Sequence, residues 1–230
     1  MCKKLKTLEE IKQYVNREYW EEGNKSGYKK KGLDLWWSGR WCQCFNRIIP
    51  LYGKRLLDLG CGVGGFVTMC NLFGADSYGV DLSKYAIEKY KREGKRLGLT
   101  WDRCFENSCH DLSRWRDGFF DIIYSNQVFE HVPEDLIGSL VKEICRVARM
   151  GAVLWFAFQM PEDNRHKKAK EDPDKTHITL YGRKWWDSKF QKAGLVPAPD
   201  IDILLKDTIT EPDHYSFFGE FNWTTLVYRK

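Results

Sequence analysis

The residues best suited to chemistry lie in and around a glycine-rich stretch, "LLDLGCGVGGF", at positions 56–66. Gly60, Gly62 and Gly65 have the G-x-G-x-x-G spacing of loops that approach a nucleotide cofactor. Asp81 follows about 20 residues later, where a carboxylate can accept both hydroxyls of a ribose. By spacing alone, this pattern predicts a dinucleotide-dependent oxidoreductase. Asp58 argues against that reading, because its negative charge would repel a pyrophosphate on the loop.

Asp58 instead suits a cofactor that carries positive charge. A carboxylate there would attract an ammonium group and tolerate a sulfonium, and S-adenosylmethionine carries both cations in its methionyl part. Its carboxylate suits the N-terminus of the helix that follows the loop. Taken singly, Asp58 can equally be a solvated residue at a strand end, and Asp81 a helix N-cap. Together, on consecutive strand ends around a glycine turn, they favour a cofactor site.

Alternating strands and helices position these residues. From residue 54 onward, apolar runs of strand length alternate with segments of helical periodicity. This alternation predicts a mainly parallel, doubly wound α/β sheet. The expected strands are Arg55–Leu59, Ser77–Asp81, Thr100–Glu106, Phe119–Ser125 and Ala152–Gln159, and the expected helices between them are Gly64–Phe73, Ser83–Leu97 and Pro133–Arg149.

The two ends of the chain differ from this alternating core. Helices are expected at residues 7–22 and at Trp36–Ile49, and they form an N-terminal arm. The highly charged stretch Pro161–Asp174 is long for a connection and predicts a lid or a mobile loop. After it we expect a helix at Arg183–Ala193 and strands at Ile201–Leu205 and Trp223–Tyr228. We expect a single domain over 1–230, with the arm at 1–50, the cofactor-binding core at 51–160, and the lid loop and C-terminal sheet edge at 161–230.

Composition narrows the class of protein. The chain has 230 residues, of which 43% are hydrophobic, so it can bury a core. Its longest strongly apolar run, Ala152–Phe158, is too short to span a membrane, and the N-terminus lacks an apolar signal segment. We therefore expect a cytoplasmic protein that does not use a membrane. The eight cysteines have no zinc-like spacing, and the net charge of +5 is mild. These features predict no metal site and argue against a nucleic-acid partner.

Four segments together resemble class I S-adenosylmethionine-dependent methyltransferases, most closely the ubiquinone/menaquinone-biosynthesis-like branch. The segments are "LLDLGCGVGG" (56–65), "GVDLS" (79–83), "FFDIIYSNQVFEHVP" (119–133) and "LVKEICRVARMGAVLWF" (140–156). The resemblance covers about residues 50–160. It implies a Rossmann-like, seven-stranded, mostly parallel sheet whose last strand is antiparallel, here "WTTLVYRK" at Trp223–Lys230, preceded by a helical arm.

The resemblance also implies a set of cofactor-binding residues. Asp81 takes the ribose, and Leu82 flanks the adenine. Ser108 or Cys109 stands where the family has an acidic residue for the adenine amino group, so backbone contacts or a shifted Asp111 can substitute for it. The remaining residues border the methionyl group and the reaction centre: Asp58, Gly60, Cys61, Gly62, Asn126 and Gln127.

The acceptor chemistry is less visible in the sequence. Transfer from a sulfonium needs mainly alignment and exclusion of water, and a general base only when the nucleophile carries a proton of high pKa. The candidate catalytic residues are His177, which is the first choice for a base, His131, whose commoner role is structural, and Tyr19. Further aromatic residues of the arm can form an acceptor wall or simply pack against the sheet: Trp20, Tyr28, Trp36, Trp37 and Trp41.

Two absent motifs narrow the acceptor. No Asp/Asn-Pro-Pro-Tyr follows the fourth expected strand, which argues against enzymes that methylate the amino groups of nucleic-acid bases. No Pro-Cys dipeptide supplies the nucleophile of a cytosine C5 enzyme. A small-molecule acceptor is therefore favoured, and the lysines of the arm and the charged loop suit an anionic one. The alternatives are a methyltransferase acting on RNA or protein, and a catalytically silent scaffold that binds S-adenosylmethionine. The oxidoreductase suggested by the glycine spacing is a further one.

Overall fold

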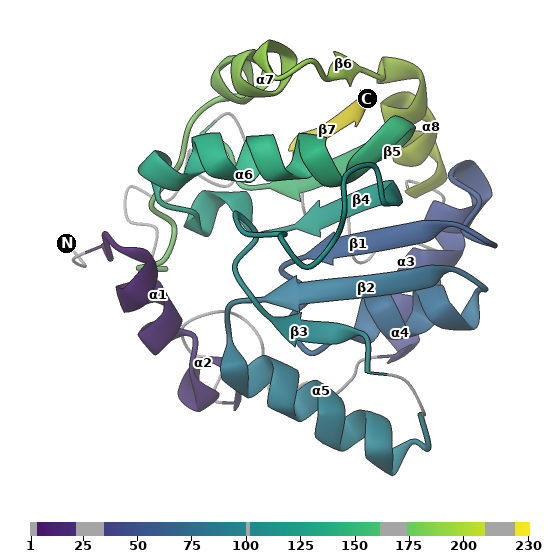
Figure 1. The fold of residues 1–230 in the computed structure, drawn as a ribbon, viewed down its shortest axis with the longest axis vertical. Helices are drawn as coiled ribbons and strands as arrows, with labels where there is room; N and C mark the ends of the chain where they lie inside the picture. Colours follow the sequence, from purple (N-terminus) through teal and green to yellow (C-terminus); the bar gives the residue numbers. More distant parts are fainter. Residues whose placement is uncertain (1–3, 22–34, 100–101, 162–173, 210–223) are drawn as a thin grey trace.

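One mixed sheet organises the protein. The computed structural model describes residues 4–21, 35–99, 102–161, 174–209 and 224–230. Within these ranges seven strands pair in the order β3-β2-β1-β4-β5-β7-β6 (Figure 1). Strands β1 to β5 run parallel, and β7 runs antiparallel to both β5 and β6. The strands are β1 (Arg55–Leu59), β2 (Asp76–Asp81), β3 (Cys104–Glu106), β4 (Phe120–Asn126), β5 (Ala148–Phe158), β6 (Val196–Pro197) and β7 (Thr224–Arg229). The predicted fold, with seven strands and an antiparallel last strand, is confirmed.

Helices cover both faces of this sheet. None of those in the described ranges is long and apolar enough to cross a bilayer. The helices are α1 (Leu8–Tyr14), α2 (Arg17–Glu21), α3 (Leu35–Ile48), α4 (Gly65–Leu72), α5 (Lys84–Arg96), α6 (Glu134–Val147), α7 (Arg183–Lys192) and α8 (Pro199–Ile209), with a 3₁₀ turn η1 (Phe129–His131) before α6.

The alternation of side chains along each strand divides the core into two layers. Leu57 and Leu154 belong to the layer that packs against α6 and α7. Their neighbours Leu56 and Trp155 point to the opposite face and pack against α3, α4 and α8. Figure 1 shows α6 crossing one face of the sheet while α3 and α4 lie behind the other. Because both faces are covered, the strands read as continuous apolar runs.

Parts of the C-terminal half differ from the sequence expectation. Ile201–Leu205, expected as a strand, lies in helix α8. Pro199 begins this helix and acidic residues occupy its first turn, which are two features that favour a helix start. Strand β6 was not predicted, β3 is shorter than expected, and β5 begins at Ala148 rather than Ala152. Tyr28, Trp223, the side chains of Trp36 and Trp37, and most of the charged stretch lie outside the described residues.

The expected helix at residues 7–22 is two helices with a break between them. The side chain of Asn16 accepts a hydrogen bond from the backbone N–H of Glu18 at 3.0 Å and so begins α2. The carbonyl of Val15 leaves the helical pattern and accepts the Ser83 hydroxyl at 2.5 Å. A tertiary contact with the start of α5 therefore competes successfully with the local helical preference.

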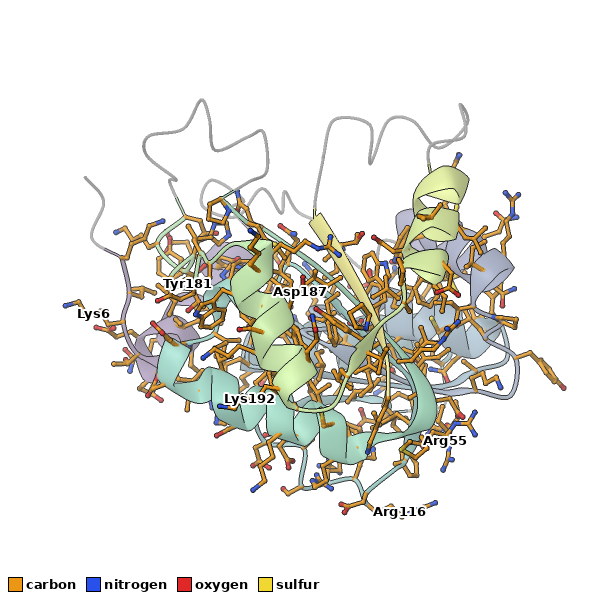
Figure 2. All side chains as sticks on the ribbon, turned by 90° about the horizontal axis from the view of Figure 1, so that it is seen from above. Lys6, Arg55, Arg116, Tyr181, Asp187 and Lys192 are labelled. Carbon is orange, nitrogen blue, oxygen red and sulfur yellow. The ribbon has the colours of Figure 1, made fainter. Side chains whose placement is uncertain are left out.

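The arm formed by α1 and α2 lies at the edge of the sheet where the parallel strands end (Figure 1). The indole N–H of Trp20 donates to the Ser83 hydroxyl oxygen at 2.9 Å, which joins α2 to the beginning of α5. Figure 2 shows Lys6, just before α1, on the opposite side of the molecule from Arg55, the first residue of β1. The arm therefore faces the carboxyl ends of the strands, where ligands of doubly wound sheets bind.

Phe156 tests the packing of the core. Its side chain is fully buried on β5 and contacts the rings of Phe129, Phe190 and Tyr228. We expect Phe156→Ala to lower the free energy of unfolding by about 3–5 kcal/mol, because the substitution removes apolar contacts and leaves a cavity. Met150→Ala on the same strand is the matched control, since Met150 is 77% exposed and should change stability by less than about 0.5 kcal/mol. Equal effects in urea denaturation would contradict this packing.

Candidate active site

A cavity of about 320 Å³ lies where β1, β2 and β4 end. Its wall combines the glycine loop, the ends of these strands and the N-terminal arm. All ten residues that the sequence analysis assigned to a cofactor line it: Asp58, Gly60, Cys61, Gly62, Asp81, Leu82, Ser108, Cys109, Asn126 and Gln127. The structure thus brings together residues that are up to 69 positions apart in the chain.

The glycine loop turns sharply from β1 toward α4. Gly60 has a φ of +76°, and a Cβ atom there would come within 2.1 Å of Val128 Cγ2. The backbone N–H groups of Gly60 and Cys61 both donate to the carbonyl of Val80, at 2.8 and 2.9 Å. Glycine at position 60 is therefore required both by the backbone conformation and by the close approach of the segment that follows β4.

The carboxylate of Asp81 holds the loop against the next helix. One of its oxygens accepts the backbone N–H of Gly62, and the other accepts that of Ser83, each at 2.8 Å. Burial raises the pKa of Asp81 to about 6, although these two hydrogen bonds act in the opposite direction. Each carboxylate oxygen has a second lone pair, so Asp81 can still accept hydroxyl groups of a ligand.

Asp58 places a second negative charge in the same cavity. Its side chain is only 3% exposed. Burial, together with the charge of Asp81, raises the pKa of Asp58 well above its usual range. Across the described ranges, neither carboxylate forms an ion pair with a basic side chain. A pair of carboxylates of which one is buried is costly by itself and suits a ligand that brings positive charge.

Asn126 and Gln127 continue the wall after β4. Gln127 has a φ of 58°, which is rare for a residue other than glycine. Asn126 Oδ1 and Gln127 Nε2 are buried and have no hydrogen-bond partner in the described protein. Unsatisfied buried amides and a strained backbone both cost stability, and such costs are characteristic of ligand sites.

The end of the cavity near β3 is built differently from the family pattern. Ser108 and Cys109 line it, together with Asn107, which the sequence analysis did not single out. Asp111, considered as a substitute acidic residue, does not line the cavity, and its side chain accepts the N–H of Ser113 at 3.1 Å. Burial raises the pKa of the Cys109 thiol to about 12, so this sulfur stays protonated.

The arm closes the cavity on the side away from the sheet. Tyr19 and Trp20 are buried and line it, together with the apolar side chains of Leu8, Ile11 and Val15. Of these, only the two aromatic residues were candidates from the sequence. Trp41 instead packs on the sheet, since its ring lies 5.3 Å from that of Trp155 and its N–H donates to Tyr124 at 2.7 Å.

The candidate histidines occupy different places. His131 lines the cavity, whereas His177 is not among the lining residues and contacts the ring of His131 at 4.7 Å between centroids. Glu130 is fully buried beside them, and burial raises its pKa to about 7. In the described part of the chain, these three residues form the cluster whose ligand atoms lie close enough, within 4.8 Å, to hold a metal ion. The cysteine spacing examined in the sequence gives no sign of it.

Comparison with known proteins agrees with this geometry. The model of a family described as "Methyltransferase domain" matches residues 57–156. A ubiquinone biosynthesis O-methyltransferase from Methylococcus capsulatus is 30% identical over 107 residues, which cover 46% of this chain and 44% of that protein. Residues 57–156 are a class I S-adenosylmethionine-dependent methyltransferase domain.

Two further proteins are similar to this chain. A sterol 24-C-methyltransferase from Aspergillus fumigatus is 35% identical over 102 residues, which cover 44% of this chain and 26% of that protein. The structure of a SAM-dependent methyltransferase from Archaeoglobus fulgidus superposes with a TM-score of 0.60 at 15% identity, covering 84% of this chain and 94% of that one. The matched segments span less than half the length of the ubiquinone and sterol methyltransferases.

The cavity of this methyltransferase domain suits S-adenosylmethionine by its chemistry. Gly60 keeps the loop narrow at this point, because its positive φ and the contact with Val128 leave no room for a side chain. Asp58 offers negative charge to the ammonium and sulfonium groups, Asp81 offers acceptors to the ribose hydroxyls, and Asn126 Oδ1 and Gln127 Nε2 offer partners for polar atoms of the methionyl part. A pyrophosphate would meet two carboxylates here, so the oxidoreductase suggested by the glycine spacing is disfavoured.

Replacing Asp58 tests whether the cavity carries this unfavourable charge. Its folded-state pKa lies above the unfolded value of 3.8, so its contribution to stability is present below that value and is lost as the pH rises. We expect Asp58→Asn to raise the free energy of unfolding at pH 8, and to raise it by less at pH 5.

Asp121→Asn provides the control for this prediction. Asp121 accepts the backbone N–H of Arg55 at 2.8 Å and pairs with Arg149 at 2.5 Å, so its replacement should lower stability. Urea denaturation at the two pH values measures both effects. A loss of stability in Asp58→Asn at pH 8 would show that the Asp58 charge is compensated within the protein.

Proposed function

We propose that the chain transfers the methyl group of S-adenosylmethionine to an oxygen, nitrogen or carbon nucleophile of a small-molecule acceptor, by in-line displacement. The pair of carboxylates around the glycine loop, the buried Asp58 and the half-buried Asp81, carries this proposal, because it favours a cationic nucleoside cofactor. Relatives named for ubiquinone and sterol methylation support a small acceptor, and they differ in whether oxygen or carbon receives the methyl group.

In this proposal different residues bind different parts of the cofactor. Asp58 faces the ammonium and sulfonium groups, and the glycine loop with Cys61 lets the methionyl part approach the backbone. Asp81 accepts the ribose hydroxyls, while Leu82 and the Ser108–Cys109 turn border the adenine. The unsatisfied atoms Asn126 Oδ1 and Gln127 Nε2 bond the methionyl group next to the reaction centre.

The chain's own contribution to the reaction is alignment, exclusion of water and removal of a proton. Bound S-adenosylmethionine supplies a methyl group that is already activated on a sulfonium. The apolar side chains of α1, with Trp20, cover the reacting atoms. His131 is the candidate base for an acceptor whose nucleophile carries a proton, because it lines the cavity whereas His177 does not. Tyr19, on the arm side of the same cavity, is positioned to bind the acceptor.

The shape of the cavity favours a small acceptor over a macromolecule. The arm is bonded on one side to Ser83 and on the other to the segment after residue 174, where Leu5 N–H donates to the Lys175 carbonyl at 3.0 Å. An RNA or protein substrate would need a more open approach than this cover leaves. The predicted preference for an anionic acceptor depends mainly on lysines outside the described residues. Lys12, which is described, pairs with Glu106 at 2.9 Å.

Asp81→Ala tests the cofactor site. We expect this variant to bind S-adenosylhomocysteine at least about 100-fold more weakly, since it loses hydrogen bonds to a charged group worth about 1.5–3 kcal/mol each and also the tether of the glycine loop. Isothermal titration calorimetry measures the change. Asp76→Ala is the matched control, because Asp76 begins the same strand and pairs with Arg103 at 3.0 Å away from the cavity. An unchanged affinity in Asp81→Ala would remove Asp81 from the site.

A screen with labelled methyl groups tests the reaction itself. The protein is incubated with methyl-labelled S-adenosylmethionine and fractionated cell extracts, and products are scored by mass spectrometry. We expect a labelled small molecule and an equal amount of S-adenosylhomocysteine, with Asp81→Ala as the inactive control. Label in the RNA or protein fraction would support the macromolecular alternative. Binding of the cofactor with no labelled product in any fraction would support the silent scaffold.

A further inference from the structure

A chain of hydrogen bonds leads from His131, in the wall of the cavity, to a buried carboxylate behind it. His131 Nδ1 lies 2.7 Å from the hydroxyl oxygen of Thr176. That hydroxyl donates to Asp174 Oδ1 at 2.6 Å, and the backbone N–H of Thr176 donates to the same oxygen at 2.8 Å. Thr176 is fully buried and Asp174 is 8% exposed. None of these bonds joins residues that the methyl-transfer proposal uses, apart from His131.

Counting protons along this chain fixes the state of the histidine. A threonine hydroxyl has one proton, and here it is donated to Asp174. The same hydroxyl can then only accept from His131, so Nδ1 must carry a hydrogen. In a neutral imidazole the other nitrogen, Nε2, is consequently the basic one. Nε2 lies on the other edge of a ring that lines the cavity.

The segment that carries Thr176 forms hydrogen bonds with the residues on both sides of His131. The backbone N–H groups of Ile178 and Thr179 donate to the carbonyl of Glu130 at 2.9 and 3.0 Å. The hydroxyl of Thr179 donates to the carbonyl of Val132 at 2.6 Å. These bonds connect the residues directly before and after His131 to the segment that follows the charged stretch. The Thr176 contact is therefore held in register by its neighbours.

We propose that Thr176 and Asp174 are positioning residues that hold His131 in its Nδ1–H tautomer, so that Nε2 accepts the proton of the methyl acceptor. This inference rests on the proposed function. The proton leaves the nucleophile and a new N–H bond forms at Nε2, while the electron pair stays on the nucleophile for its bond to the methyl group. The bond between the methyl carbon and sulfur breaks, and its electron pair stays with S-adenosylhomocysteine as the leaving group. The resulting imidazolium is stabilised by Asp174 through Thr176, as a buried carboxylate orients and stabilises the base in other enzymes.

Several other ionisable groups lie near the imidazole ring of His131. The ring centroids of His131 and His177 are 4.7 Å apart, and Nε2 of His177 lies 3.8 Å from the second carboxylate oxygen of Asp174. Glu130 accepts the Gln159 N–H through Oε1 at 3.2 Å, and its Oε2 has no hydrogen-bond partner in the described protein. On the arm side, the Lys4 ammonium donates to the Asp174 carbonyl at 2.5 Å. The rival role for Nε2 in these surroundings is metal ligation.

Nitrogen NMR on the full chain with ¹⁵N-labelled histidine reads the tautomer directly, without cofactor or acceptor. We expect His131 at neutral pH to show a protonated Nδ1 and an unprotonated Nε2. Thr176→Val, which keeps the shape and removes the hydroxyl, should shift the ring toward the other tautomer, and Thr176→Ser should restore the first. A protonated Nε2 in the unmodified protein would overturn the proposal without any variant. An unchanged tautomer in Thr176→Val would do the same.

Kinetics separate a positioning role from a structural one. With the acceptor found by the labelling screen, we expect Thr176→Val to lower kcat by about 10–100-fold, which is part of the roughly 100–10,000-fold that general base catalysis contributes, and to shift the acidic limb of its pH profile. The KM for the acceptor and the affinity for S-adenosylhomocysteine should stay within about twofold. Rescue by Thr176→Ser is expected. A change confined to KM, or a loss of cofactor affinity, would overturn the positioning role.

Titration with Mg²⁺ and Zn²⁺ tests the rival role. Micromolar binding that perturbs the Nε2 resonance of His131 would overturn its assignment as a base, because that nitrogen would be a metal ligand. The absence of such a perturbation supports the base. Failure of the labelling screen would overturn the proposed function while the tautomer measured by NMR stands. A wrong tautomer would overturn this inference and leave methyl transfer intact.

Discussion

The architecture of the site depends on one half-buried carboxylate with two backbone partners. Asp81 accepts the N–H of Gly62 from the glycine loop and the N–H of Ser83 from the start of α5. Ser83 then accepts the Trp20 indole and donates to the Val15 carbonyl, so the arm is anchored at the same point. The loop, the helix and the cover of the cavity are thus coupled through a single strand end, and a ligand that bonds Asp81 contacts all three.

The negative charge at this strand end destabilises the free protein. Asp58 and Asp81 are close enough for the charge of one to raise the pKa of the other, and burial raises both. Gln127 adds a backbone conformation that few side chains adopt, and its amide is left without a partner in the described protein. Groups that destabilise the free protein are stabilised when a complementary ligand binds. The same residues therefore explain both why the cavity lowers the stability of the free protein and why it selects a complementary ligand.

Local patterns allowed part of this site to be predicted. Asp58 and Asp81 end apolar runs of strand length, and parallel strands bring their carboxyl ends to one edge, so their place in the cavity wall followed from spacing and fold. The other predicted lining residues, such as Asn126 and Gln127, followed from the family resemblance. Ile201–Leu205 was predicted wrongly because its alternating apolar residues fit a strand, while Pro199 and the tertiary packing of α8 favour a helix. The choice between His131 and His177 depends on which of them lines the cavity, and no local pattern encodes that. The contact of His131 with Thr176, 45 positions away, is equally invisible in the sequence. The place of the arm residues Leu8, Ile11 and Val15 in the cavity wall could not be predicted either, since any amphipathic helix shows their spacing.

We propose that the carboxylates of Asp58 and Asp81 select a cationic nucleoside cofactor, on a loop whose glycine spacing also fits a dinucleotide. Parallel calorimetric titrations of the full chain with S-adenosylhomocysteine, S-adenosylmethionine and NADH test it most directly. Binding of both adenosyl compounds, with no heat from NADH under the same conditions, is the result this account predicts. Tight binding of NADH without binding of either adenosyl compound would contradict it.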